Sequence, residues 1–382
     1  MGVERNRNLD IVRACATLLV VLYHSWVLTN STGFQIPIVK LIVSLGGELG
    51  VTCFFVLSGY GIYCSLWGAE NNNSLSFASF MQKRCKRIIP SYYICLLITM
   101  FLGSGAIYLS RSNWANIITH VLFIHNLFPG YAGAINGVLW TIGVTVQFYI
   151  IAIPLYKGIK KWNFLFLSAC IVFTVVCKTA VFRFVLPMLG GEHLGFFAGR
   201  QVLTSLDNFV VGMAVADLVV HRKKQLKRPW AYGGSLFGIA ALLLICKIGA
   251  KCGIHTNNIS GYVWHTLIAA AIGVFLYAVS YIECDSSRRL YRAFLWLSKC
   301  EYGIYLWHLV IIRNLIENAS FVSSLMNRGY YKVLYIIFIC VSVFMGWLMS
   351  KMTDSIRFDS IFRKKIGEGR GFPITEGSSK NR

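Results

Sequence analysis

Charged residues are scarce in this 382-residue chain: they make up 14% of it, whereas hydrophobic residues make up 56%. A soluble domain carries about 25% charged residues. The apolar residues form repeated runs of about twenty, the length that crosses a bilayer as a helix. No run shows the roughly ten-residue alternation of a membrane β-strand. The sequence therefore predicts an all-α, multi-pass membrane protein.

Recognisable metal-binding and disulfide patterns are also lacking. The twelve cysteines are scattered, with no Cys-x-x-Cys pair and no Cys/His ligand spacing. We interpret them as small buried hydrophobic residues, and we expect no metal and no permanently bound cofactor. Acidic residues are few, 15 against 37 Lys plus Arg. Because the basic residues lie in short clusters between apolar runs, they indicate cytoplasmic loops and not a nucleic-acid-binding surface.

The basic residues also predict the topology. The segments between apolar runs alternate, with 26 Lys plus Arg in one set and 5 in the other. Cytoplasmic loops carry the excess, so both termini are expected in the cytoplasm and the number of spans should be even. The short apolar stretch 115–128 is interpreted as an external re-entrant or interfacial helix. The ten predicted spans are 11–28, 46–66, 88–108, 138–156, 164–186, 205–220, 231–249, 262–282, 303–318 and 332–350.

We expect one membrane domain over residues 1–352 and no soluble catalytic domain at either end. Residues 353–382 are basic and rich in Gly and Ser, which predicts a disordered cytoplasmic tail close to anionic lipid.

The first apolar run, Asn8–Leu28, contains three costly polar residues, Asp10, Arg13 and His24. On a helix, Asp10 and Arg13 lie about 60° apart and His24 falls between them. Polar groups that share one stripe of a membrane helix usually face the bundle interior and mark a pathway or site. In the alternative interpretation, the first two lie among lipid headgroups and His24 bonds a backbone carbonyl.

A basic cluster within Phe80–Tyr93 contains Arg84 and Arg87. Arginine forks suit bidentate contacts to the phosphates of a cytosolic cofactor. A plain positive-inside loop would look the same from this cluster alone.

Other polar residues lie in or beside later spans. Ser58 and Tyr60 flank a glycine that permits close helix packing. Gln147 needs a polar partner within the membrane, and a lone histidine such as His308 is more often structural than catalytic. Asn136 and Trp140 are expected near the outer interface. Arg183, Glu192, His193 and Asp207 are expected near the outer side, where they either line an acceptor pocket or pair with each other.

Together these segments resemble the acyltransferase family 3 proteins, which are bacterial integral-membrane acyltransferases. The match covers about residues 5–310 through LDIVRACATLLVVLYH, GVTCFFVLSGY, FMQKRCKRIIPSYY, WTIGVTVQFY and YGIYLWH. The resemblance implies a ten-helix bundle that moves an acyl group, usually acetyl, from cytosolic acyl-CoA to a hydroxyl. The implied acceptor is a cell-surface glycan, its lipid-linked precursor or a lipid. His24 matches the family's proposed catalytic histidine, and Arg84 and Arg87 match its arginine pair linked with the CoA donor.

The chain departs from the family pattern at two places. Thr145 stands where the family has Glu after the Trp, and LMSKMTDSIRF, with Asp354, replaces a Glu-Pro at the last span. The first departure questions either activity or the role of that Glu. We expect Thr145 to be a polar lining residue, facing His24 if the first and fourth spans are neighbours.

The sequence thus predicts an O-acyltransferase in the cytoplasmic membrane of a bacterium. His24 would accept the hydroxyl proton, or carry the acyl group transiently, and Arg13 would join the paired arginines at the CoA phosphates. The alternatives are a transporter or flippase for a lipid-linked sugar, and a non-catalytic family member. The supporting residues are expected to be Asp10, Ser58, Tyr60, Asn136, Trp140, Thr145, Gln147 and His308.

Overall fold

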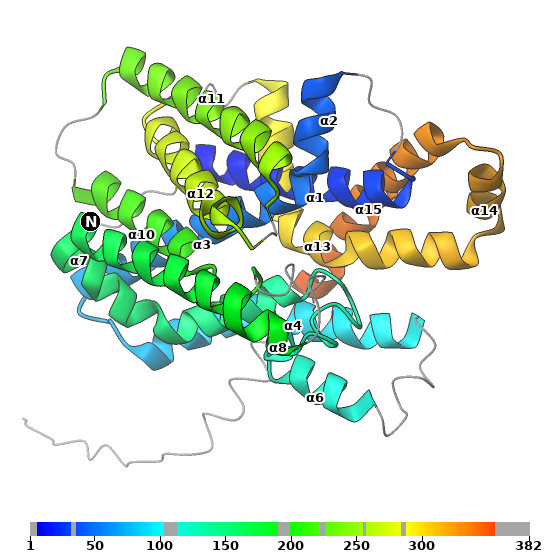
Figure 1. The fold of residues 1–382 in the computed structure, drawn as a ribbon, viewed down its shortest axis with the longest axis horizontal. Coiled ribbons are helices and arrows are strands. Elements are labelled where there is room, and N and C mark those ends of the chain that lie inside the picture. Colours follow the sequence, from blue (N-terminus) through cyan, green and yellow to red (C-terminus); the bar gives the residue numbers. More distant parts are fainter. Residues whose placement is uncertain are drawn as a thin grey trace, which may run out of the picture.

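The computed structural model describes residues 6–31, 36–102, 113–189, 199–221, 226–254, 257–283 and 288–355, and in these ranges it contains helices and no strand (Figure 1). The all-α prediction is confirmed for this part of the chain. The helices are α1 (Arg7–Leu28), α2 (Pro37–Ser44), α3 (Gly46–Asn71), α4 (Phe77–Leu102), α6 (Trp114–Val121), η2 (His125–Leu127), α7 (Trp140–Ala180), η3 (Val181–Val185), α8 (Leu186–Met188), α10 (Leu206–His221), α11 (Arg228–Cys252), α12 (Ile259–Val279), α13 (Arg289–Asn318), α14 (Ser320–Asn327) and α15 (Tyr331–Ser355).

Seven helices in the described ranges are long and apolar enough to cross a membrane, which confirms the multi-pass prediction. The pair α13 and α14, bent by 80°, makes an eighth if the two count as one broken span. Two predicted spans, 138–156 and 164–186, correspond to the continuous stretch from α7 to α8, which begins at Trp140. The predicted span at 205–220 corresponds to α10, which has only 16 residues.

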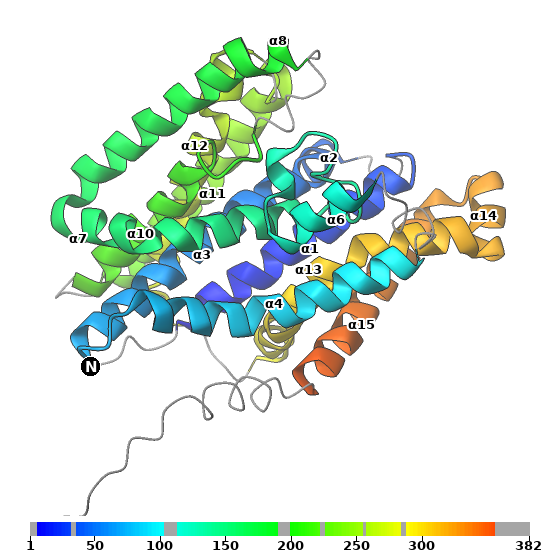
Figure 2. The ribbon, with the colours of Figure 1, turned by 90° about the horizontal axis from the view of Figure 1, so that it is seen from below.

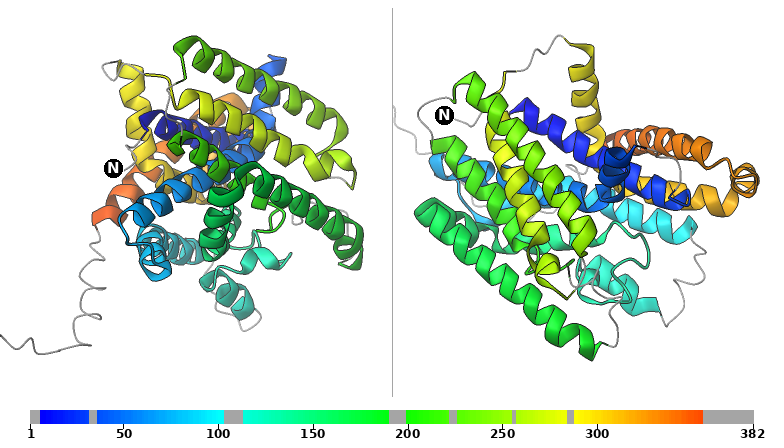
Figure 3. Two further views of the ribbon diagram at one scale, coloured as in Figure 1. Left: turned by 90° about the vertical axis from the view of Figure 1, so that its left-hand side faces the viewer. Right: turned by 45° about the horizontal axis from the view of Figure 1, so that its top comes forward.

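The most buried of these candidate spans is α3, which packs against α1 and α10. A Cβ atom on Gly59 would lie 1.9 Å from the Phe209 carbonyl oxygen, and one on Gly212 equally close to the Val56 carbonyl oxygen. The two backbones therefore touch only because both positions are glycine, as small residues allow in membrane helices. The predicted close approach at Gly59 is confirmed. By contrast, α11 lies outside the bundle next to α12 (Figure 3).

The stretch predicted as a short external helix forms α6 and η2. Tyr92 and Tyr93 of α4 donate hydrogen bonds to the carbonyls of His120 and Val121, which fix α6 against α4. At the other end of the chain, α15 continues to Ser355, so the predicted tail begins with the end of a helix. The rest of that tail lies outside the described residues.

Candidate active site

The polar residues of α1 face a matching set on α13. Arg13 Nε lies 3.4 Å from Glu301 Oε1, and His24 Nδ1 lies 3.0 Å from His308 Nε2. Arg13 pairs with Glu301, and the later residue His24 pairs with the later residue His308, so the two helices run in the same direction. Glu301, Tyr305 and His308 recur at the spacing of one helix face. The stripe predicted on α1 therefore lies against a second polar stripe within the bundle.

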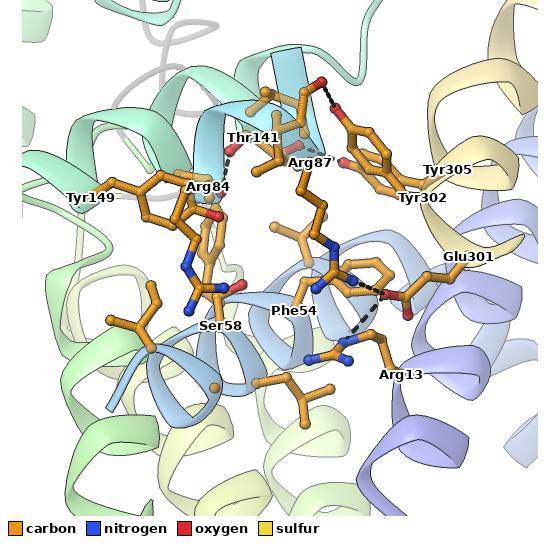
Figure 4. Close-up of a pocket in the computed structure, with 18 residues that line it drawn as sticks. Arg13, Phe54, Ser58, Arg84, Arg87, Thr141, Tyr149, Glu301, Tyr302 and Tyr305 are labelled. Atoms are coloured by element: carbon orange, nitrogen blue, oxygen red, sulfur yellow. Dashed lines mark hydrogen bonds and ion pairs between the residues drawn. The ribbon is translucent and has the colours of Figure 1, made fainter. Parts of the chain in front are cut away.

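The first cavity, here termed the arginine pocket, has an empty volume of about 870 Å³ (Figure 4). Arg13, Arg84 and Arg87 all line it. The fold thus brings the basic cluster of α4 to the arginine of α1, although about seventy residues separate them in the sequence.

Positive charge is only partly balanced in the arginine pocket. Glu301 Oε1 lies 3.4 Å from Arg13 and 3.8 Å from Arg87, and Arg13 also contacts Asp10 at 3.5 Å. The Arg84 guanidinium instead lies over the rings of Phe80 and Tyr149, 5.4 and 5.9 Å from their centroids. Three guanidinium groups thus face two carboxylates, and the surplus positive charge suits an anionic ligand.

The second cavity, here termed the histidine pocket, measures about 580 Å³. His24 and Tyr23 of α1 line it together with Glu48 of α3. Trp140, the first residue of α7, lines it as well, and the Arg200 guanidinium lies 4.3 Å from the Trp140 ring centroid. Burial lowers the pKa of Arg200 to about 10, so this side chain stays charged at neutral pH.

Backbone carbonyls select the tautomers of the two facing histidines. His308 Nδ1 lies 2.8 Å from the Tyr305 carbonyl and 3.2 Å from that of Ile304. A carbonyl only accepts, so Nδ1 carries the hydrogen and Nε2 of neutral His308 is an acceptor. His24 Nδ1 lies 3.0 Å from this Nε2 and 3.0 Å from the Val20 carbonyl, so it carries a hydrogen too. His24 Nε2 therefore keeps its lone pair, which a molecule in the histidine pocket can use.

The two pockets meet at Val51 and Tyr305, which line both. The Tyr305 hydroxyl lies 2.9 Å from Thr141 Oγ1, and its ring meets Phe54 edge-on with centroids 5.3 Å apart. These contacts hold Tyr305 between the arginines and His24. A ligand that extends from one pocket to the other has to pass Val51 and Tyr305.

Ser58 and Thr145 both line the arginine pocket. Thr145 donates a hydrogen bond of 2.7 Å to the Thr141 carbonyl. The expectation that Thr145 faces His24 is wrong. The first turn of α7, with Thr141, already reaches Tyr305, so the next turn lies at the level of the arginines.

Three other predicted residues, Tyr60, Asn136 and Gln147, line neither pocket. Gln147 Nε2 donates to the Phe123 carbonyl at 2.9 Å and so holds the chain that follows α6. Asn136 Nδ2 donates to the Leu306 carbonyl of α13 at 3.0 Å. Tyr60 is buried within the helix core. Their positions indicate packing and support rather than contact with a ligand in these two pockets.

Sequence reasoning missed three features of the site. Glu301 has a clear signal in retrospect, because it is a carboxylate in an apolar stretch, on the same helix face as His308. Arg200 is the only Lys or Arg in the sequence from residue 187 to residue 204. Glu48 and His265, whose side chains lie 3.0 Å apart, come from helices distant in the sequence and gave no local signal.

The outer cluster predicted around Arg183 and Asp207 does not form an acceptor pocket in the described residues. Asp207 is buried and pairs with Lys178 at 3.6 Å, whereas Arg183 is exposed. Glu192 and His193 lie outside the described residues.

Comparison with known proteins places this geometry in context. The chain matches the family model for an acyltransferase domain over residues 6–351. It is 26% identical over 331 residues to the peptidoglycan O-acetyltransferase OatA of Listeria monocytogenes, covering 80% of this chain and 49% of that protein. It is also 26% identical over 332 residues to the putative peptidoglycan O-acetyltransferase YrhL of Bacillus subtilis, with 80% and 48% covered. A putative O-acetyltransferase of Staphylococcus aureus is 26% identical over 370 residues, with 88% and 54% covered. The chain thus spans about half the length of these relatives. No solved structure matches it.

Proposed function

Since this chain belongs to the acyltransferase domain family and is a multi-pass membrane acyltransferase, we propose that it transfers an acetyl group from cytosolic acetyl-CoA to a hydroxyl of a cell-envelope glycan. The relatives named as peptidoglycan O-acetyltransferases support an acetyl donor group and a glycan acceptor. A lipid-linked glycan precursor is included in this acceptor class.

The observation that carries the proposal is the alignment of two stripes on α1 and α13. They bring a cationic pocket and the lone pair of His24 Nε2 to two neighbouring cavities, whose linings share Val51 and Tyr305. Along α1, His24 lies about 16 Å beyond Arg13. A long flexible donor with phosphates at one end and a thioester at the other suits this arrangement.

At the donor end, Arg13, Arg84 and Arg87 would contact the CoA phosphates. Guanidinium groups favour phosphate because their planar donors form bidentate hydrogen bonds. Glu301 holds Arg13 and Arg87 in place before the donor arrives. The pantetheine arm then extends past Tyr305 toward His24.

At the acceptor end, His24 Nε2 would take the proton of the glycan hydroxyl. The hydroxyl oxygen attacks the thioester carbonyl, so a C–O bond forms and the C–S bond breaks. The CoA thiolate leaves and takes the proton back from His24. His308 keeps the His24 ring oriented through the bond at Nδ1, so His308 is a positioning residue.

We also propose ten spans and cytoplasmic termini, in the cytoplasmic membrane of a bacterium. The backbone at Asn163 is non-helical (φ 26°), and a Cβ on Gly158 would lie 2.5 Å from the Phe166 ring. The chain therefore turns back at Asn163, and the two halves of α7 diverge from this turn (Figure 2), which supports their assignment as two crossings. Together with α10 and α13, this raises the seven candidate spans to ten.

Contacts at the helix ends support the same topology. Asp217 at the end of α10 accepts hydrogen bonds from Tyr63 and from Asn163. At the opposite end of α3, Glu48 contacts His265 near the start of α12. These contacts mean that α3, α10 and α12 run in the same direction. Two membrane helices that run in the same direction must be separated by an odd number of crossings, and the order of ten spans meets this condition for each pair.

The function is tested with the purified protein, labelled acetyl-CoA and a glycan acceptor. We expect His24→Ala to reduce acetyl transfer by at least ~10²-fold, the usual effect of losing a positioned proton-transfer group. His221→Gln is the matched control, because His221 is exposed and lines neither pocket. Wild-type protein that moves a lipid-linked sugar across vesicles but neither transfers nor hydrolyses acetyl-CoA would support a flippase instead.

A further inference from the structure

A third cavity lies between the C-terminal ends of α4 and α13 and the segment 134–136. Its empty volume is about 790 Å³. We term it the polar pocket, because six of its lining side chains are polar: Thr99, Asn136, Arg313, Asn314, Glu317 and Asn318. Arg313, Glu317 and Asn318 are exposed and Asn314 is half-buried, so a ligand can reach their polar atoms.

Two of the six polar side chains of the polar pocket have hydrogen-bond partners among the described residues, and the other four do not. Thr99 donates to the Cys95 carbonyl and Asn136 to that of Leu306, so these two have structural partners. The other four polar residues, all on α13, form no hydrogen bond or ion pair with any residue in the described part of the chain: Arg313, Asn314, Glu317 and Asn318.

The polar pocket adjoins the histidine pocket. Arg313 follows His308 on α13 by about 7.5 Å along the helix axis. Gly137 lines the histidine pocket, and a Cβ atom there would lie 3.1 Å from Leu309 Cδ2 and 4.0 Å from Arg313 Nη2. Gly137 thus lies between the histidine pocket and the Arg313 side chain of the polar pocket.

The chemistry of the polar pocket fits sugars better than phosphates. Two of its unused side chains are amides, which both donate and accept, and the others are one guanidinium and one carboxylate. Arg313 and Glu317 cancel in formal charge, so the pocket offers no surplus cation to an anionic headgroup. Amides and a carboxylate match the hydroxyl and acetamido groups of a glycan.

We propose that the polar pocket binds sugar units adjacent to the one that is acetylated, so that the enzyme recognises a glycan chain rather than an isolated sugar. This inference rests on the proposed function for its acceptor. The reacting sugar lies at His24, and its neighbours extend past Gly137 to Asn314 and Asn318.

The experiment compares a β-1,4-linked N-acetylglucosamine pentamer with the monosaccharide. Binding of both is measured by calorimetry, and acetyl transfer to both is measured as kcat/KM. We expect Asn314→Ala and Asn318→Ala each to weaken pentamer binding and lower kcat/KM for the pentamer about 5–10-fold, the effect of one or two hydrogen bonds. Transfer to the monosaccharide, acetyl-CoA hydrolysis and thermal stability should not change. Asn327→Ala, on α14 and outside the polar pocket, is the matched control.

The outcomes separate the two proposals. Equal losses with pentamer and monosaccharide, or wild-type protein with no preference for the pentamer, would overturn the polar pocket as a glycan site. Pentamer binding that depends on Asn314 without any acetyl transfer would uphold the polar pocket and overturn the proposed reaction.

Discussion

Replacing His308 tests how the facing histidines work. The structure gives His24 Nδ1 two acceptors, His308 Nε2 and the Val20 carbonyl, each at 3.0 Å. In His308→Ala the Val20 carbonyl remains and still selects the tautomer with a free Nε2. The variant therefore loses one hydrogen bond and some orientation of the ring, but it keeps His24, the proposed base.

The expected size of the effect follows from this geometry. A single hydrogen bond contributes about 0.5–1.5 kcal/mol. Since 1.36 kcal/mol corresponds to tenfold in rate, kcat/KM should fall ~2–13-fold. His24→Ala should cost at least ~10²-fold. His308 is fully buried, so His308→Gln, which fills more of the site and offers an amide oxygen as acceptor, should recover most of the loss.

Initial rates of acetyl transfer for the two single variants and the double variant provide the assay. Because His308 is expected to act through His24, the double variant His24→Ala/His308→Ala should be no slower than His24→Ala alone. Thermal unfolding of each purified variant controls for lost stability. A folded His308→Ala variant as slow as His24→Ala, with additive losses in the double variant, would refute the positioning role and place His308 at the reacting atoms.

Four further predictions follow from the two pockets and from α6. Arg87→Ala should weaken CoA binding by about 1.5–3 kcal/mol, and calorimetry should show little effect on a short pantetheine thioester without nucleotide phosphates. Val51→Phe should narrow the junction between the pockets, so transfer falls while calorimetric CoA affinity stays unchanged; a loss of both would contradict a local block. Thr145→Glu should weaken CoA binding, because it adds a carboxylate among the arginines, and should leave the pH–rate profile unshifted. Burial lowers the pKa values of His120 and His125 to about 4 and 3, below their ordinary value, so the unfolded chain takes up protons first as pH falls below ~6.5. Stability should therefore fall by up to ~2 kcal/mol per histidine between pH 6.5 and 5, seen as earlier unfolding in wild type than in His120→Gln/His125→Gln.

Local patterns predicted those parts of the fold that depend on neighbouring residues in the sequence. Apolar runs identified the helices, and the family resemblance based on five short motifs is confirmed by the match over residues 6–351. The 3.6-residue period was enough to place Arg13 and His24 on the same face of one helix. It could not show that Arg13 lies at one pocket and His24 at another, because this depends on Tyr305 from α13.

Pairing between distant helices was not readable from the sequence. Glu301 and His308 meet Arg13 and His24 only because α1 and α13 pack side by side in parallel. The turn at Asn163, by contrast, was predicted, because the lysines of residues 157–163 separate the predicted spans 138–156 and 164–186. Asn tolerates a positive φ because its short polar side chain can bond locally, so the break needs no glycine.

The position of Glu301 bears on whether the departure at Thr145 removes activity. The family pattern predicts a carboxylate at that point of the fourth span, and this chain has a hydroxyl there. Thr145 lines the arginine pocket, and the same pocket already holds the Glu301 carboxylate, within 3.4 Å of Arg13 and 3.8 Å of Arg87. A second carboxylate at position 145 would make the pocket less cationic and so less suited to phosphate. Loss of a Glu at this position therefore leaves Glu301 beside Arg13 and Arg87 and makes the proposed donor site more positive, which favours an active acyltransferase over a non-catalytic member of the family.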